Sequence, residues 1–291
     1  MNIKNYYRGV IINYHNMSKK ELERQVDILS KKFNFISHDD FVSNNFNFKK
    51  DFCLLTFDDG KKNNSEVVAP VLKSLGIPAI FYITTGFINT KEILWFDIYN
   101  NLYELYGEKE NIVDTKIVLK MPQKQRRRYL DKLIEEFDFK IEKNNDDINP
   151  MKWSDVKKLA KWGFTIGAHS VNHSILTRET LKTAQTEIKD SINDIEQNIN
   201  MVCNTFAFPN GNYNYQLIDY IKKFNIRTIM TTEPTWINYN SSYNRLPRIQ
   251  LDPGFSKTKI KSKLFIAKFG RFLKNPDGTE YLYKKINNLS K

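Results

Sequence analysis

Two adjacent carboxylates follow a short apolar run in the N-terminal part of the chain. Asp58 and Asp59 come directly after residues 52–57 and are followed by Gly60. Neighbouring carboxylates repel each other unless a cation or a proton lies between them, and a glycine turn would let each one point in its own direction. Taken alone, the pattern is more typical of an ordinary surface turn. A functional role becomes the better interpretation only if other polar side chains lie close to these two carboxylates in the folded protein.

A pair of histidines stands four residues apart after another apolar run. Two imidazoles spaced like His169 and His173 can bind one metal ion, although an isolated pair is more often structural. With Asp59 as a third ligand, the set is typical of an open catalytic zinc site. A bound cation would polarise a carbonyl group and lower the pKa of a water molecule, which leaves Asp58 to act as a general base. This chemistry is metal-assisted hydrolysis of an amide or ester.

The chain has four histidines, and the other two differ in their surroundings. His15 closes the apolar run 9–14, where a strand-end structural role is the simplest interpretation of the residue alone. His38 precedes a predicted helix start with Ser37 and Asp39 as candidate N-caps. We therefore assign His38 a structural role.

Apolar runs alternate with helical patterns along much of the chain. This alternation predicts parallel β/α units, and so many units in 291 residues favour a barrel. The predicted strands are 9–14, 52–57, 77–84, 163–169, 203–208 and 226–232, and the predicted helices are 18–33, 65–75, 153–163, 180–199 and 214–224. Barrel chemistry sits at the carboxyl ends of the strands. We therefore expect His15, Asp58, His169 and Pro209 to face one another at one rim.

Two segments lie outside this alternation. Residues 91–150 are charged and predict a mostly helical insertion in a barrel domain that spans 1–255. Residues 256–291 form a basic C-terminal extension with ten Lys and Arg against two Asp and Glu, within a chain whose net charge is +12. Such a surface can attract an anionic partner, although a solvated basic face is the more ordinary interpretation. No nucleic-acid-binding motif is present, so we expect no nucleic-acid partner.

The composition also indicates a compartment. Cys53 and Cys203 lie far apart in apolar runs, which is not the pattern of a disulfide framework or a cysteine metal site. No apolar stretch has the length of a signal peptide core or a membrane span. We therefore expect a cytoplasmic protein.

Three segments together resemble the ordered motifs of the polysaccharide deacetylases, the NodB-homology or carbohydrate esterase family 4 group. They are Thr-Phe-Asp-Asp-Gly at 56–60, His-Ser-Val-Asn-His at 169–173 and Phe-Ala-Phe-Pro-Asn-Gly at 206–211. Leu-Pro-Arg-Ile at 246–249 resembles a late segment of the branch often encoded with surface-polysaccharide genes. The resemblance covers about residues 8–250. It implies an α/β fold, a distorted (β/α)7 barrel, that hydrolyses N-acetyl, and sometimes N-formyl or O-acetyl, groups on sugars.

The resemblance also implies roles for individual residues. Asp59, His169 and His173 would hold a divalent metal, usually Zn²⁺, and Asp58 would be the base that activates water. The backbone N–H of Asn210 would help to bind the oxyanion. Pro209 and Gly60 are assigned to the same oxyanion and substrate region.

The chain departs from the family pattern at three positions. Asn210 stands where many members have Tyr. No histidine follows His173, although the family usually has a late histidine as general acid; His15 fits members that have this histidine at the end of the first strand. The arginine that orients the base is also missing from its usual segment, and Arg248 is the candidate replacement. The alternative for Arg248 is an ordinary surface ion pair.

The function expected from these residues is metal-dependent removal of an N-acyl group from an amino sugar. The predicted substrate is a nucleotide-linked or lipid-linked intermediate of surface-glycan biosynthesis, and the basic extension would meet phosphates or the anionic inner surface of the membrane. The alternative is a catalytically silent glycan-binding protein on the same fold. Acetyl and formyl differ by one methyl group, a difference worth about 1–3 kcal/mol, and the sequence pattern does not separate them.

Overall fold

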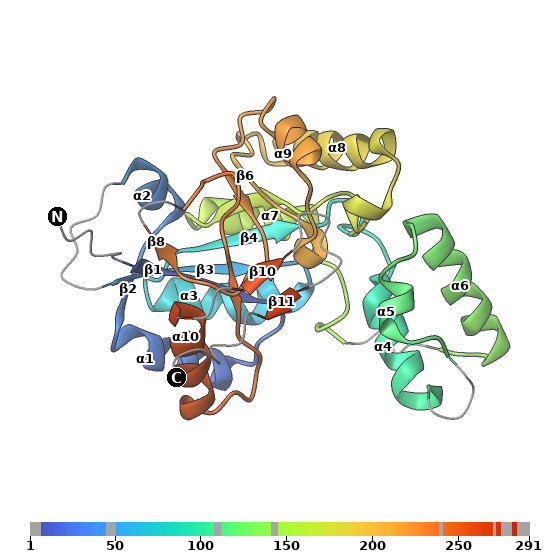
Figure 1. The fold of residues 1–291 in the computed structure, drawn as a ribbon, viewed down its shortest axis with the longest axis horizontal. Helices are drawn as coiled ribbons and strands as arrows, with labels where there is room; N and C mark the ends of the chain where they lie inside the picture. The colour runs from blue at the N-terminus through green and yellow to red at the C-terminus, as the bar shows by residue number, and fades with distance from the viewer. Residues whose placement is uncertain are drawn as a thin grey trace, which may run out of the picture.

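A curled, mainly parallel sheet forms the centre of the molecule (Figure 1). This computed structural model describes residues 7–44, 51–107, 112–140, 145–238, 241–269, 272–274 and 281–283. The strand order is β7-β6-β5-β4-β3-β1-β8. The bounds are Tyr7–Tyr14 for β1, Asp51–Phe57 for β3, Ala79–Ile83 for β4, Thr165–Ala168 for β5, Thr205–Ala207 for β6, Thr228–Met230 for β7 and Ile237–Asn238 for the antiparallel β8. All six predicted strands are therefore present.

The segment 246–250 lies between the first and last parallel strands and joins them. On one side, the backbone of Leu246 exchanges hydrogen bonds with Ile229 and Thr231, both at 2.8 Å. On the other side, β9 (Ile249–Gln250) pairs in parallel with β1. Within the described residues, β1, β3, β4, β5, β6, β7 and the segment 246–250 thus adjoin one another in parallel around the sheet, as expected for a distorted (β/α)7 barrel. Residues 33–35 add a short parallel strand beside the start of β3.

Both faces of the strands are buried, which explains their nearly continuous apolar sequences. Alternate residues such as Ile11, Leu54 and Tyr82 form a cluster on one face, whereas Val10, Leu55 and Phe81 face the other side and belong to the larger core. The strand period of two produces this division. The polar residues that follow the strands are therefore held at the rim by two packed faces.

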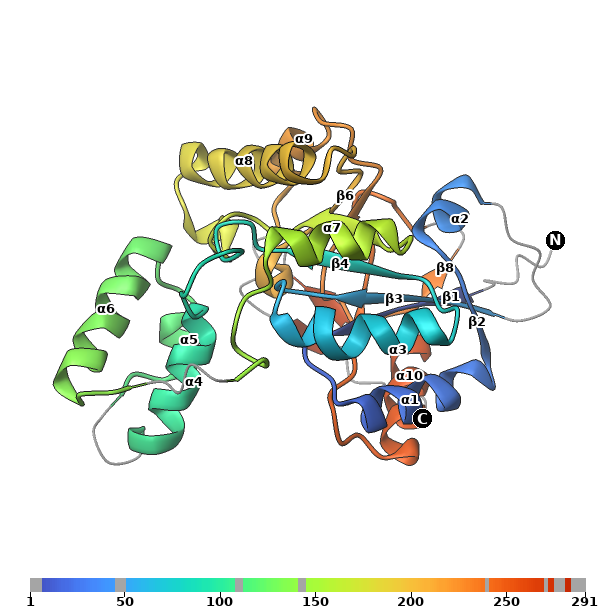
Figure 2. The ribbon, with the colours of Figure 1, turned by 180° about the vertical axis from the view of Figure 1, so that it is seen from behind.

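Helices and short segments connect the strands (Figure 2). They are α1 (Lys19–Ser30), β2 (Phe33–Phe35), α2 (His38–Ser43), a π-helical turn (Asn64–Val68), α3 (Ala69–Ser74), α7 (Trp153–Lys161), a 3-10 turn (Leu176–Arg178), α8 (Leu181–Ile199), a second 3-10 turn (Pro209–Gly211) and α9 (Tyr215–Ile221). After the last strand of the sheet come α10 (Lys257–Phe269) and a separate strand pair, β10 (Phe272–Lys274) and β11 (Tyr281–Tyr283). The first predicted helix ends earlier than expected, because Phe33 already pairs with Asp51 in the sheet.

The helix starts follow local capping chemistry. The Ser18 side chain accepts a hydrogen bond from the Glu21 backbone, and Ser37 forms a capping box with Asp40. His38 is buried behind this cap, 2.8 Å from the Thr228 hydroxyl. Its place in the core confirms the structural interpretation of this histidine.

The insertion forms a separate helical lobe beside the carboxyl ends of β3 and β4 (Figures 1 and 2). It contains α4 (Trp95–Tyr106), α5 (Thr115–Val118) and α6 (Gln123–Glu136). A cluster of its own, which includes Trp95, Leu102, Leu130 and Leu133, holds the helices together. The expected mostly helical insertion is thus confirmed. Arg126, from its basic run, is buried, and its guanidinium lies 4.1 Å from the Trp95 ring centre.

The C-terminal extension is only partly described. Helix α10 packs on the main core through Ile260 and Leu264, and the Trp236 indole donates a 2.8 Å hydrogen bond to the Leu264 carbonyl. Apart from α10, β10 and β11, the basic residues expected to meet an anionic partner lie outside the described residues. No helix within the described ranges is long and apolar enough to cross a membrane.

Candidate active site

The register of β1 and β3 brings two predicted site residues to the same level. Tyr14 is paired with Phe57, and the Asp58 backbone N–H donates a 3.1 Å hydrogen bond to the Tyr14 carbonyl. His15 and Asp58 are therefore the next residues of two adjacent parallel strands. His15 is half-buried, and its carbonyl accepts a 2.9 Å hydrogen bond from the Asn64 side chain.

Asp58 and Arg248 form a buried bidentate pair. Nη1 of Arg248 lies 2.7 Å from Oδ1 of Asp58, and Nη2 lies 2.9 Å from Oδ2. Both residues are almost fully buried, which excludes the surface ion pair considered for Arg248. Burial alone would raise the pKa of Asp58, but the charge of the Arg248 guanidinium and its hydrogen bonds outweigh burial and hold this pKa below its usual 3.8. The carboxylate is therefore ionised and fixed in orientation at neutral pH.

Neighbouring polar groups complete the support of this pair. Nε of Arg248 donates to the Thr231 carbonyl at 2.9 Å, and Nη1 also contacts the Asn13 side-chain oxygen at 3.1 Å. The Thr56 hydroxyl donates to the same Asn13 oxygen at 3.2 Å. Sequence reasoning missed Asn13, although a polar residue within the apolar run of β1 was a usable signal.

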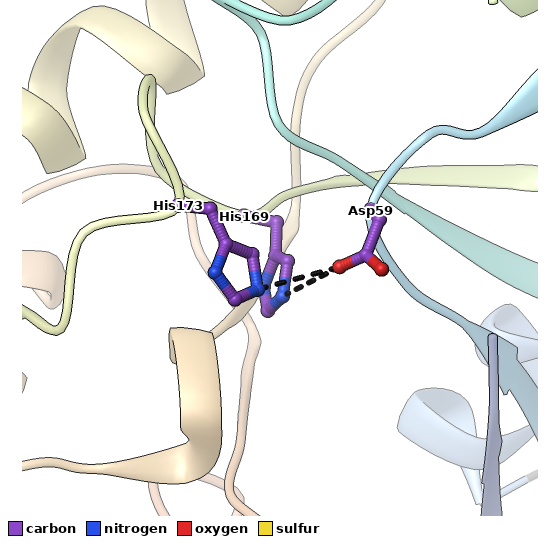
Figure 3. A group of neighbouring side chains, drawn as sticks. All are labelled: Asp59, His169 and His173. Carbon is purple, nitrogen blue, oxygen red and sulfur yellow. Dashed lines mark ion pairs between the residues drawn. The ribbon is translucent and has the colours of Figure 1, made fainter. Parts of the chain in front are cut away.

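Asp59, His169 and His173 converge from two loops (Figure 3). Oδ1 of Asp59 lies 3.3 Å from Nε2 of His173 and 3.8 Å from Nε2 of His169. One candidate donor atom from each residue falls within 4.8 Å of the others, and all three residues are buried. Two ligands of a tetrahedral zinc ion, each about 2.1 Å from it, lie roughly 3.4 Å apart. The observed separations fit such an ion.

The chemistry of the three donors also fits a cation. Nδ1 of His169 lies 2.8 Å from the Ala207 carbonyl, which can only accept, so Nδ1 carries the proton and Nε2 presents its lone pair to Asp59. Burial lowers the pKa of His169 to about 4, which keeps this imidazole neutral at pH 7. Both Asp59 oxygens are buried without a hydrogen-bond partner among the described residues. A buried carboxylate of this kind calls for a counter-charge.

Neighbouring side chains hold the pKa of Asp59 down. Burial would raise its pKa, but His15, His173 and Lys61 lower it to well below its usual value. The effect of His15 on Asp59 places its imidazole in the electrostatic neighbourhood of the carboxylate pair. His15 is not among the three residues whose donor atoms converge in the described part of the chain.

The backbone of the site is held in uncommon conformations. Asp59, Ser170, His173 and Asn210 have φ values of 82°, 62°, 50° and 55°, in a region that non-glycine residues rarely adopt. Such strain persists only where the surroundings enforce it, and it clusters at functional sites. For the histidine loop, the Glu187 carboxylate supplies this support, because it accepts hydrogen bonds from the backbone N–H groups of Val171 and Asn172 at 3.0 and 2.9 Å.

The remaining predicted site residues form turns at the same rim. Gly60 is buried with φ +81°, and its carbonyl accepts a 3.0 Å hydrogen bond from the Met151 backbone. Pro209 is buried at the start of the turn after β6, and Asn210 is exposed next to it. Ala207, two residues before Pro209, is the partner of His169, so this turn lies beside the histidine pair.

Helix α4 of the insertion also reaches the site. The Trp95 indole donates a 3.1 Å hydrogen bond to the His173 carbonyl, and the Phe96 ring centre lies 4.8 Å from that of His173. Asp97 pairs with the buried Lys61 at 2.8 Å. Sequence reasoning missed these contacts because nothing in the local pattern of 91–150 indicates which helix meets the rim.

Comparisons with known proteins agree with this geometry. A sequence profile described as polysaccharide deacetylase matches residues 46–229, which is more than half of the chain. The protein YxkH of Bacillus subtilis (strain 168) is 25% identical over 203 residues, which are 70% of this chain and 52% of YxkH. The chain thus spans about half the length of this curated relative.

Solved structures share the fold at low sequence identity. The Streptococcus pyogenes deacetylase PplD, in complex with acetate, has a TM-score of 0.60 at 19% identity, with 88% of this chain and 97% of that chain covered. IcaB from Ammonifex degensii has a TM-score of 0.61 at 14% identity, with 89% and 97% covered. These likenesses show that the barrel is of the NodB type.

Proposed function

The chain belongs to the polysaccharide deacetylase family, and from this premise we propose that it hydrolyses the N-acyl group of an amino sugar with the help of a divalent metal ion. The observation that carries the proposal is the separation of two adjacent carboxylates into different surroundings. Asp58 is held by Arg248, whereas Asp59 faces two imidazoles. One carboxylate is thus suited to proton transfer and the other to metal binding.

Each site residue receives a role in this proposal. Asp59, His169 and His173 would hold the ion, which we take to be Zn²⁺, and a bound ion would supply polarisation of the acyl carbonyl and a lowered pKa for a water molecule. Asp58 accepts the proton of the attacking water. Arg248 orients Asp58 through its two hydrogen bonds and keeps it ionised.

Two further roles concern the oxyanion and the leaving group. The backbone N–H of Asn210, in the turn that begins at Pro209, stabilises the oxyanion. Gly60 shapes the turn that follows Asp58 and Asp59. His15 protonates the departing amine. Its position next to Asp58 in the strand register supports this role.

The substrate proposal is an amino sugar linked to a nucleotide or a lipid diphosphate. The chain's net charge of +12 supports an anionic substrate or a contact with an anionic membrane surface. The acyl group is acetyl or formyl, and the cytoplasmic location stays a prediction.

The experiment that tests this function measures acid release. Zinc-loaded protein is incubated with UDP-linked N-acetyl and N-formyl amino sugars, with their lipid-diphosphate-linked forms and with neutral N-acetylated oligosaccharides, and acetate and formate are quantified by NMR. We expect release from a phosphate-linked substrate and none after chelation. Absence of release from every substrate by protein that contains zinc would contradict the proposal.

Replacement of His15 by Ala should lower kcat by about 10²-fold, the usual contribution of a general acid, with zinc content unchanged. The amine would then depart without a proton donor. The measurement is kcat together with zinc content, and His15→Gln serves as a second variant of similar size. Loss of zinc would instead make His15 a ligand or a support of the site, and an unchanged kcat would remove it from the mechanism.

A further inference from the structure

The Lys61 ammonium lies buried between two carboxylates. Its Nζ is 2.8 Å from Oδ2 of Asp97 and 4.0 Å from Oδ2 of Asp59, and only 4% of its side chain is exposed. Asp59 is fully buried, and 13% of the Asp97 side chain is exposed. In the described ranges, these two carboxylates are the ion-pair partners of Lys61. The ammonium is thus drawn toward Asp97 and away from the metal-binding carboxylate.

Because the Lys61 ammonium lies close to Asp59, it can compete with the metal ion for this carboxylate. Both Asp59 oxygens lack a hydrogen-bond partner among the described residues, so a nearby ammonium could satisfy them as well as a cation could. A buried charge that loses its partner is strongly unfavourable. Without the Asp97 charge, Lys61 would have to move only about one ångström to reach hydrogen-bond distance from Asp59.

The docking of the insertion fixes Asp97 in this place. Two neighbours of Asp97 on α4, Trp95 and Phe96, contact His173. The segment that leaves the insertion runs along the turn that carries Asp59: the Met151 N–H donates to the Gly60 carbonyl at 3.0 Å, and the Lys62 N–H donates to the Asn149 carbonyl at 2.8 Å. The insertion is therefore attached to the metal-binding loops at both of its ends.

We propose that Asp97 is a positioning residue of the insertion that holds Lys61 away from Asp59 and so keeps this carboxylate available to the metal ion. This inference rests on the proposed metal-dependent function. It makes the insertion part of the metal site, because α4 supplies the charge on which the metal affinity depends.

A double-mutant cycle tests the competition between Lys61 and the metal. The zinc dissociation constant is measured by competition with a chromophoric chelator for the wild type, Asp97→Asn and the double variant Asp97→Asn/Lys61→Met. We expect Asp97→Asn to weaken zinc binding by about 10- to 100-fold, the range that changes in the groups surrounding metal ligands usually produce. The double variant should return to within about threefold of the wild type, because the competing ammonium is gone.

Matched variants separate this effect from general damage to the insertion. Asp146→Asn breaks the exposed pair with Lys62 on the returning segment, 2.9 Å in length, and should leave zinc affinity unchanged. Asp97→Glu keeps the charge and should retain tight binding. If Asp97→Asn does not fold, as judged by circular dichroism, Asp97→Ser gives the same loss of charge in a smaller side chain.

The zinc affinities of these variants decide whether Asp97 acts by holding Lys61 away from Asp59. Wild-type affinity in Asp97→Asn overturns the inference, and so does a double variant that binds zinc as weakly as Asp97→Asn, since insertion packing would then explain the loss. A wild-type protein that binds no zinc overturns the proposed metal-dependent function and this inference with it. Tight zinc binding by the wild type without acid release counts against the catalytic proposal alone. The zinc affinities of the variants still decide the role of Asp97 in that case.

Discussion

Replacement of Asp58 by Asn should lower kcat by about 10²- to 10⁴-fold, the range usual for loss of a general base, while zinc affinity stays within a few-fold of the wild type. Asparagine has nearly the same shape but cannot accept a proton from water at neutral pH. The charge of Arg248 keeps Asp58 ionised, so the wild-type base is fully available at pH 7. The measurement is steady-state acid release with the best substrate found, together with zinc content.

Stability must be checked in the same variant, because the new amide would face the buried Arg248 guanidinium, which has then lost its counter-charge. Removal of one partner of a buried ion pair costs about 3–5 kcal/mol of unfolding free energy. Assays therefore need to be run well below the unfolding midpoint, as followed by circular dichroism. A folded, zinc-containing Asp58→Asn protein with wild-type kcat would contradict the role of Asp58. Unchanged function in the cell would revive the silent glycan-binding alternative.

Replacement of His169 by Ala should abolish measurable activity and weaken zinc binding by more than about 10²-fold. Changes to outer partners of metal ligands already cost about 10- to 100-fold, and His169 presents its Nε2 directly to Asp59. A chelator should remove the activity of the wild type, and added zinc should restore it. The same addition should not restore His169→Ala.

His38→Gln is the matched control for this variant. His38 is also buried, but its partner is Thr228 in the core, and glutamine can still hydrogen-bond to that hydroxyl. We expect His38→Gln to bind zinc as the wild type does. Tight zinc binding by His169→Ala would contradict the ligand set of Asp59, His169 and His173.

Local sequence patterns predicted most elements of the barrel. Apolar runs became β1, β3, β4, β5, β6 and β7, and Ser18 and Ser37 cap the helices that follow them. These features depend on residues a few positions apart, so they can be recognised without the fold. The early end of α1 was missed because the pairing of Phe33 with Asp51 is set by the sheet and not by the helix pattern.

The spacing of motifs also indicated the candidate ligands. Asp59, His169 and His173 each follow a parallel strand, and the rule that such strand ends meet at one rim was sufficient to bring them together. Their convergence within 4.8 Å bears out that expectation of proximity. The rule says which residues share a rim, but not which of them touch.

Contacts between distant segments depended on tertiary structure. The family resemblance named Arg248 as the candidate to orient Asp58, but their 2.7 Å contact spans 190 residues and forms because the segment 246–250 closes the barrel between β7 and β1. Asp97 meets Lys61 because the insertion docks on the rim, and no local pattern states where a helical lobe will pack. The sequence by itself therefore determined the strands, the polar residues that follow each strand and the residue types suited to hydrolysis. Only the tertiary structure decided how their charges are paired, since pairing depends on burial and on distances across the closed sheet.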